Sequence, residues 1–144
     1  MSVPRNKLGA TFGAAVILGL TAAPTLASPA SGLWRTPTGG SVEVYDCGAA
    51  LCGRVATDSP AAAGGSRLDV HNKTVALCSR PIVGLEIMTG FSGGPERWSG
   101  GKIYNPDDGG VYSGTLNLVS PSSIELVGCV VAPICKKQTW TRLK

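Results

Sequence analysis

The chain has 144 residues, of which 13 are Lys or Arg and 9 are Asp or Glu, and its formal net charge is +4. A chain of this length is expected to fold as one domain with its own core, so a multidomain protein is not expected. Apart from Lys136-Lys137 the basic residues are scattered. A nucleic-acid partner is therefore not indicated, because such partners usually need a clustered basic face.

Residues 1–27 have the three-part pattern of a secretory signal peptide. Arg5 and Lys7 form a short basic region, 8–26 carries no charge and is rich in apolar and small residues, and small residues then stand at cleavage spacing. We expect cleavage after Ala27 or after Ala30, which leaves a mature domain of about 28–144.

An uncleaved membrane anchor is the alternative interpretation of this segment. Gly13, Gly19 and Pro24 interrupt its apolar stretch, whereas a membrane-spanning helix usually needs about 20 strongly apolar residues. We therefore expect export to the periplasm or the extracellular space, with no stable membrane insertion after cleavage. Without Arg5 and Lys7 the chain keeps 11 basic against 9 acidic residues.

The rest of the chain alternates short β-prone runs with turn residues and has almost no helical periodicity, which is typical of an all-β protein. Eight candidate strands follow in chain order: 32–36, 41–47, 51–57, 81–89, 96–104, 111–119, 123–129 and 135–142. The strongest turn is Asn105-Pro106-Asp107-Asp108-Gly109-Gly110. The one long irregular segment is 58–80, in which 61–65 is expected to be a mobile loop and 70–79 to hold one helical turn.

Eight consecutive antiparallel strands would leave two open edges, and closure into a barrel removes both. Closure would bring Trp34 on the first strand near Arg142 on the last. The indole would then plug one end of the barrel under a stacked guanidinium. The interior of an eight-stranded barrel is either filled by side chains or holds one small ligand.

All five cysteines lie after residue 46. Cys47 with Cys52, and Cys129 with Cys135, each bracket a turn between two strands, so two hairpin disulfides are expected in an exported protein. A zinc site is the rival interpretation, although the spacing within each pair is longer than in most zinc-binding motifs. Cys78 is left over, either as a small buried hydrophobe or as a cross-link between chains.

The mature region resembles DUF2147, a family of small exported bacterial proteins, over nearly all of 32–142. The residues that carry the resemblance are Gly32-Leu33-Trp34, Arg80-Pro81-Ile82-Val83-Gly84, Trp98-Ser99-Gly100-Gly101-Lys102-Ile103-Tyr104-Asn105-Pro106-Asp107-Asp108-Gly109 with Tyr112, Gly128-Cys129 and Gln138-Thr139-Trp140-Thr141-Arg142. The resemblance implies a lipocalin-like (calycin-type) barrel and an exported protein, and it implies no established activity.

No residue set predicts catalysis, a metal or a cofactor. His71 is the only histidine, so a histidine-rich metal site or a Ser-His pair has little material. Asp107 and Asp108 suggest calcium at first, but the turn chemistry of their segment already explains them. Asp69 and Arg80 are expected to brace the long loop as an ion pair.

Two expectations concern the strand faces. Glu86 is expected to face solvent, and Glu96 to share a face with Trp98 and Tyr104.

The leading functional hypothesis is a non-enzymatic barrel that binds a small, partly apolar or amphipathic molecule in its interior. Trp98, Tyr104 and Tyr112 are predicted to contact this ligand, with Arg80 at the rim. The alternative is a structural or protein-interaction module with a solid core, and a hydrolase is a third, weaker candidate. The sequence makes no prediction about the oligomeric state.

Overall fold

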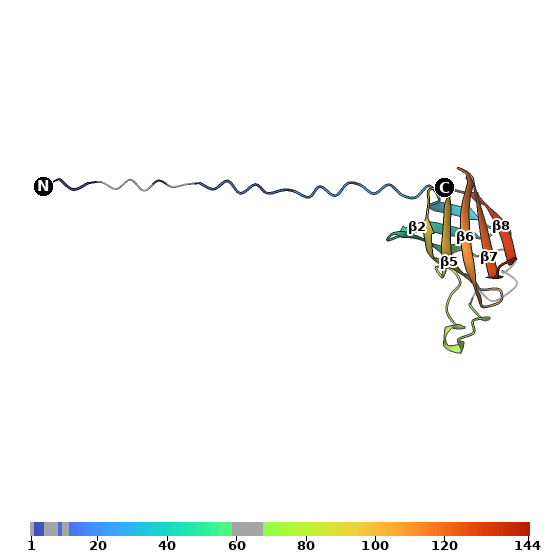
Figure 1. Ribbon diagram of the computed structural model, residues 1–144. Coiled ribbons are helices and arrows are strands. Elements are labelled where there is room, and N and C mark those ends of the chain that lie inside the picture. The colour runs from blue at the N-terminus through green and yellow to red at the C-terminus, as the bar shows by residue number, and fades with distance from the viewer. Residues whose placement is uncertain (1, 5–8, 10–11, 59–67) are drawn as a thin grey trace.

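The computed structural model describes the chain except residues 1, 5–8, 10–11 and 59–67 (Figure 1). Eight antiparallel strands close into one barrel in chain order, the last pairing with the first. They are β1 (Gly32–Arg35), β2 (Ser41–Cys47), β3 (Ala50–Thr57), β4 (Glu86–Gly93), β5 (Arg97–Asn105), β6 (Gly110–Ser120), β7 (Ser123–Val131) and β8 (Ile134–Arg142). The predicted all-β barrel is confirmed.

The two ends of the barrel differ. At the open end lie the turns that follow β1, β5 and β7, together with the long connection from β3 to β4. This connection contains the short 3₁₀ helix η2 (Val75–Leu77), the helical turn expected within 70–79. Figure 1 shows the described part that contains η2 outside the barrel, away from the C-terminus. The mobile loop expected at 61–65 lies outside the described residues. At the closed end lie the turns after β2, β4 and β6, residues 28–31 and the C-terminus.

The segment before the barrel, 12–27, has neither helix nor strand, is exposed throughout, and runs away from the barrel as an extended chain (Figure 1). Within the described residues, no helix has the length and apolar character needed to cross a membrane. The cleavable leader remains a prediction.

Arg142 and Trp34 join the two ends of the sheet. Trp34 is directly opposite Arg142 in the β1–β8 pairing, its side chain is fully buried, and the guanidinium carbon of Arg142 lies 4.1 Å from the ring centroid. The Arg142 Nε and Nη atoms also donate to the carbonyl oxygens of Pro121, Ser31 and Pro29 at 2.6, 2.8 and 2.6 Å. This is the geometry that the sequence predicts for the plug at the closed end.

Both expected disulfides are present, one at each end of the barrel. Cys47–Cys52 staples the β2–β3 hairpin at the closed end, and Cys129–Cys135 staples the β7–β8 hairpin at the open end. Cys78 is a free, half-buried thiol near the carbonyl oxygen of Asn72, 3.4 Å away, so it is neither a core side chain nor bonded to another cysteine here.

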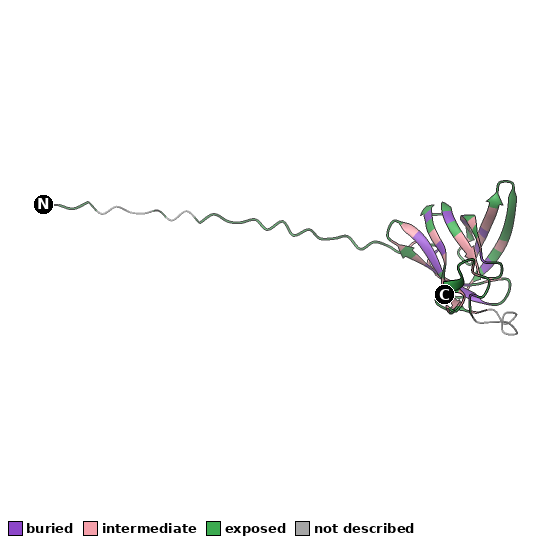
Figure 2. Ribbon diagram, turned by 90° about the horizontal axis from the view of Figure 1, so that it is seen from below, coloured by how far each residue is buried: buried purple, intermediate pink, exposed green. Residues whose placement is uncertain are grey.

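Buried and exposed positions alternate along most strands, as the period-two pattern requires (Figure 2). The inner face is shaped by a row of glycines, because Gly101 pairs with Gly114 and Gly114 with Gly128 across β5, β6 and β7. A Cβ on Gly101 or Gly114 would overlap the ring of Phe91. The missing side chains therefore make room for Phe91 to cross the interior and fill the closed half.

Two sequence expectations fail at bulges or turns. The fourth strand starts at Glu86 rather than at Pro81, because a turn with Gly84 at φ 88° precedes it; Glu86 is exposed, as expected. In β5 the register shifts between Trp98 and Gly101, with Gly100 at φ 71°. Gly101 and Ile103 then share the inner face with Trp98, so the expectation that Trp98 and Tyr104 share a face is wrong.

Replacing Arg142 by lysine should lower the free energy of unfolding by about 1–3 kcal/mol, because lysine keeps the charge but cannot stack on Trp34 while bonding three carbonyl groups. Chemical denaturation at neutral pH measures this. The matched control is Arg97→Lys at the exposed start of β5, where the side chain bonds Asn117 alone among the described residues, and it should change stability by less than about 0.5 kcal/mol. Equal effects of the two substitutions would contradict the role of Arg142.

Replacing Gly101 by alanine should cost about 1–3 kcal/mol of stability, because the new methyl group collides with the Phe91 ring in a filled part of the core. Gly128→Ala is the matched control in the same glycine row, since a Cβ there lies 3.4 Å from Ile103 Cδ1, an ordinary contact distance. Its stability should stay equal or rise slightly. Thermal unfolding of both variants separates the two positions.

Candidate functional site

The open end of the barrel contains a cavity of about 440 Å³ that is partly open to solvent. Its walls come from β4 to β8 and from the turn after β1. The lining residues are Thr36, Thr38, Ile87, Ile103, Tyr104, Asn105, Pro106, Asp107, Asp108, Tyr112, Leu126, Gly128, Val130, Ile134, Cys135, Lys136, Gln138 and Trp140. Buried side chains such as Phe91 and Leu116 fill the half of the barrel next to the closed end, and the half next to the open end holds this cavity.

One column of β8 side chains runs from the rim to the floor of this cavity. Lys136, Gln138 and Trp140 occupy alternate positions of the strand, and their exposure falls from exposed through intermediate to 2% for Trp140. The Trp140 Nε1 donates to the Gln138 side-chain oxygen at 3.0 Å. Leu126, opposite Gln138 on β7, and Ile103 on β5 complete an apolar floor.

At Gly128 the wall of the cavity carries no side chain. It pairs with Gly114 on one side and with Lys136 on the other. A Cβ at this position would meet only Ile103 Cδ1 and Tyr112 Cβ, at 3.4 and 3.7 Å. The glycine therefore exposes β7 backbone to the cavity, and part of the hollow volume exists because no side chain stands there.

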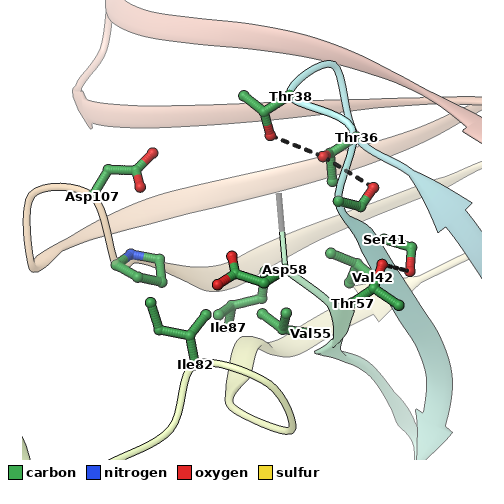
Figure 3. A pocket seen from close by; sticks show the side chains of 12 residues that line it. Thr36, Thr38, Ser41, Val42, Val55, Thr57, Asp58, Ile82, Ile87 and Asp107 are labelled. Atoms are coloured by element: carbon green, nitrogen blue, oxygen red, sulfur yellow. Dashed lines mark hydrogen bonds between the residues drawn. The ribbon is translucent and has the colours of Figure 1, made fainter. Parts of the chain in front are cut away.

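A second cavity of about 280 Å³ adjoins the first and shares Thr36, Thr38, Ile87, Pro106 and Asp107 with it. Figure 3 shows the two threonines on one side of this smaller cavity and Asp107 on the other. The threonine hydroxyl groups bond each other at 3.1 Å.

Beside the cavity, four polar side chains bind the long β3–β4 connection to β5. The Asp69 carboxylate is fully buried; Asp69 accepts from the Tyr104 hydroxyl at 2.5 Å and from Asn72 Nδ2 and Arg80 Nε, both at 2.8 Å. Arg80 also lies over the Tyr104 ring, 5.3 Å from its centroid. The expected Asp69–Arg80 ion pair is confirmed, and Tyr104 and Asn72 complete it.

These contacts shift the ionisation of both Asp69 and Tyr104. Burial raises the pKa of Asp69, but the hydrogen bonds from Tyr104, Asn72 and Arg80 and the charge of Arg80 together outweigh it and hold that pKa below its ordinary value. Burial first, and then the bond to the Asp69 carboxylate, raise the pKa of Tyr104. At neutral pH the carboxylate is therefore charged and the phenol is neutral.

Asp108 and Tyr112 form a similar pair at the tip of the β5–β6 hairpin. The Tyr112 hydroxyl donates to Asp108 Oδ2 at 2.6 Å, and Asp108 also accepts from Gly110 N and Asn105 Nδ2. Burial raises the pKa of Asp108, while these bonds and the charge of Lys73 bring it below its ordinary value. Among the described residues, no three His, Cys, Asp or Glu side chains gather as a metal-binding group.

The structure brings together only part of the predicted ligand set. Tyr104 and Tyr112 line the main cavity. Arg80 lies beside it, paired with Asp69. Trp98 is separate: it is buried in the closed half, across β6 from Leu116, and lines neither cavity at the open end.

The column on β8 is not among the predicted ligand contacts. Alternation along 135–142 places Trp140 on one face of the strand, and the same alternation puts Gln138 and Lys136 on that face as well. Lys136 lines the cavity, and its ammonium group makes no hydrogen bond or ion pair with any residue that the structure describes. It is therefore an available cation at the rim.

Replacing Asp69 by asparagine should lower the free energy of unfolding at pH 7 by about 1–3 kcal/mol. The folded-state pKa of Asp69 lies below that of an unfolded aspartate, about 3.9. Its stabilisation is therefore complete above about pH 4 and is lost as the pH falls through the folded-state value. The gap between wild type and variant should narrow in acid, measured by denaturation at a series of pH values.

The control for this series is Asp107→Asn, since Asp107 is exposed and its carboxylate accepts no hydrogen bond from a described residue. This variant should follow the wild-type pH profile within about 0.5 kcal/mol. An Asp69→Asn deficit that stays constant down to the lowest pH would show that the lost stability does not come from the ionised carboxylate.

Comparison with known proteins identifies the family to which the chain belongs. Residues 32–142 match the family described as "Uncharacterized protein conserved in bacteria (DUF2147)". A solved protein from the human pathogen Helicobacter pylori, described as belonging to the lipocalin family, superposes with a TM-score of 0.70 at 22% sequence identity, over 79% of this chain and 82% of that one. No curated protein matches the chain. The solved structure supports the fold alone, and the match over 32–142 shows that the chain belongs to the DUF2147 family.

Proposed function

We propose that this protein is a non-enzymatic carrier or receptor that binds one small, partly apolar molecule in the cavity at the open end of its barrel. The observation behind the proposal is the half-hollow interior: a cavity of about 440 Å³ with an apolar floor and a polar rim. This volume falls in the range of about 300–1,000 Å³ that is usual for small-molecule sites.

The lining chemistry favours an amphipathic ligand. Ile103, Leu126 and Trp140 form a floor on which an apolar chain or ring loses contact with water, at a gain of about 25 cal/mol for each Å² covered. Lys136 and Gln138 stand above this floor and offer an ammonium group and an amide to a polar group. A ligand would therefore enter with its apolar part first and keep its polar part at the rim.

The same residues provide little for a reaction. The two tyrosines at the site donate to carboxylates, Tyr104 to Asp69 and Tyr112 to Asp108, and both phenols have a raised pKa. They are thus held neutral as hydrogen-bond donors and are poor bases at neutral pH. These features support binding without turnover.

The disulfide bonds and the pattern of the first residues are both consistent with export. Two disulfides persist in an oxidising compartment and are rare in a reducing one, and the first 27 residues have the pattern of a signal peptide. We accordingly propose a periplasmic or extracellular site of action. A structural or interaction module with a solid core would need no interior volume, and only the closed half fits that description.

Binding can be tested with decanoate as the probe. The exported protein should show saturable quenching or enhancement of tryptophan fluorescence, because Trp140 forms part of the floor. Native mass spectrometry of protein purified from its own host should show an added small-molecule mass. A flat titration with decanoate and with a panel of other apolar probes, together with a clean unliganded mass, would overturn the proposal.

The position of the site can be tested by filling the cavity. Gly128→Leu should weaken binding of the probe by about tenfold or more, equivalent to about 1.4 kcal/mol, because the leucine side chain would occupy open volume beside Ile103. The matched control is Thr139→Leu, which adds apolar bulk on the exposed outer side of β8 and should leave binding unchanged. Equal affinities in both variants would place the ligand elsewhere.

A further inference from the structure

Hydrogen bonding between the leading segment and the barrel begins at Ser28. Residues 12–27 are exposed and have no regular structure, and Figure 1 shows this part of the chain leading away from the domain. Ala30, three residues after Ala27, is fully buried. Ser31 N donates to the Ser28 carbonyl oxygen at 2.8 Å, so 28–31 forms a turn that lies against the closed end.

The turn is bound through its carbonyl oxygens to the plug. Trp34 Nε1 donates to the Ala30 oxygen at 2.9 Å, and Arg142 donates to the oxygens of Pro29 and Ser31 at 2.6 and 2.8 Å. The buried indole N–H and part of the guanidinium thus find their acceptors in residues that precede the first strand. The turn belongs to the folded domain.

The backbone nitrogen of Ser28 points at a carboxylate. It donates to Asp46 Oδ2 at 2.9 Å, and the Ser31 hydroxyl donates to the same oxygen at 2.9 Å. Asp46 stands at the end of β2, next to the Cys47–Cys52 disulfide. A carboxylate is thereby held against the first backbone nitrogen of the bound turn.

We propose that Ala27–Ser28 is the bond at which the chain is processed, and that the ammonium group released on Ser28 forms an ion pair with Asp46 that completes the closed end. A signal peptidase of the export route would catalyse the hydrolysis. One water is consumed, its oxygen ends in the new Ala27 carboxylate, and the Ser28 nitrogen takes up protons to become the ammonium group.

The structure distinguishes this bond from the alternative after Ala30. Cleavage there would remove the buried Ala30 side chain and the carbonyl oxygens that Trp34 and Arg142 use. The indole N–H, buried with Trp34, would lose its acceptor, which is a costly arrangement in a folded protein. Cleavage after Ala27 keeps each of these contacts and removes only chain that makes none of them.

Processing also strengthens the contact at Ser28. A neutral amide N–H becomes a positively charged group beside a carboxylate, and charge-assisted hydrogen bonds are stronger than neutral ones. The other charged residues around this turn include Arg142, which bonds it, and Glu43 and Lys144, which line the same surface groove as Ala27 and Asp46. Glu96 and Arg97 lie at this end as well, at the turn between β4 and β5.

The first test is the intact mass of the full-length chain after export by a Gram-negative host. We expect a single species that corresponds to 28–144 with two disulfides. A species that begins at Ser31, or one that retains the leader, would overturn the proposed bond. The proposed processing rests on the proposed export, but this outcome does not depend on ligand binding and leaves the proposed binding site untouched.

The second test measures how readily the new amino group reacts. A carboxylate in contact with an amine favours its charged, unreactive form by about one pKa unit or more. Acetic anhydride at neutral pH should therefore label Ser28 about tenfold faster in Asp46→Asn than in wild type, as read by peptide mass. Asp107→Asn, at the opposite end, is the control and should react like wild type. Equal rates in all three proteins would overturn the ion pair.

Discussion

The barrel depends on the contact between Arg142 and Trp34. Every other neighbouring strand pair is joined by a chain connection, whereas β1 and β8 come from opposite ends of the described domain and must find each other in space. Among the described strand pairs this seam has the fewest residue pairs, Trp34↔Arg142 and Arg35↔Thr141, and Leu33 adds backbone hydrogen bonds with Leu143 and Lys144. One guanidinium stacks on the indole and also bonds the turn before β1 and the turn before β7. The same contact therefore joins the two strands, covers the buried indole and closes that end of the barrel.

The sequence predicts those parts of the fold that local chemistry determines. The turn at 105–110 and the period-two runs on either side of it place β5 and β6 within one residue of their observed bounds. The disulfides follow because each cysteine pair brackets a single hairpin. The ring closure follows from the even number of strands, and the resemblance to DUF2147 adds independent support.

What the sequence predicts poorly depends on backbone irregularities and on contacts between distant segments. The bulge near Gly100 reverses the faces after Trp98, and strict alternation cannot anticipate such a shift. It separates Trp98 from Tyr104 and sends the Tyr104 hydroxyl to Asp69, 35 residues away. The ion pair of Asp69 with Arg80 is predicted from the sequence, whereas the two further donors to this buried carboxylate, Tyr104 and Asn72, are not. The sequence shows the charge of Lys136, but its place on the cavity wall follows from the register of β8.

The Cys129–Cys135 disulfide at the tip of the β7–β8 hairpin has a consequence for any ligand of the cavity. Val130, Ile134 and Lys136 belong to the wall that this hairpin forms, and the Cys129–Cys135 bond fixes the two strands at the point where they would otherwise fray. We expect a wall that is cross-linked in this way to keep its shape when the cavity is empty. If the proposed ligand binds there, ordering this wall costs little chain entropy, because the disulfide already joins the two strands without the ligand. Reduction of this disulfide would then loosen one wall of the cavity.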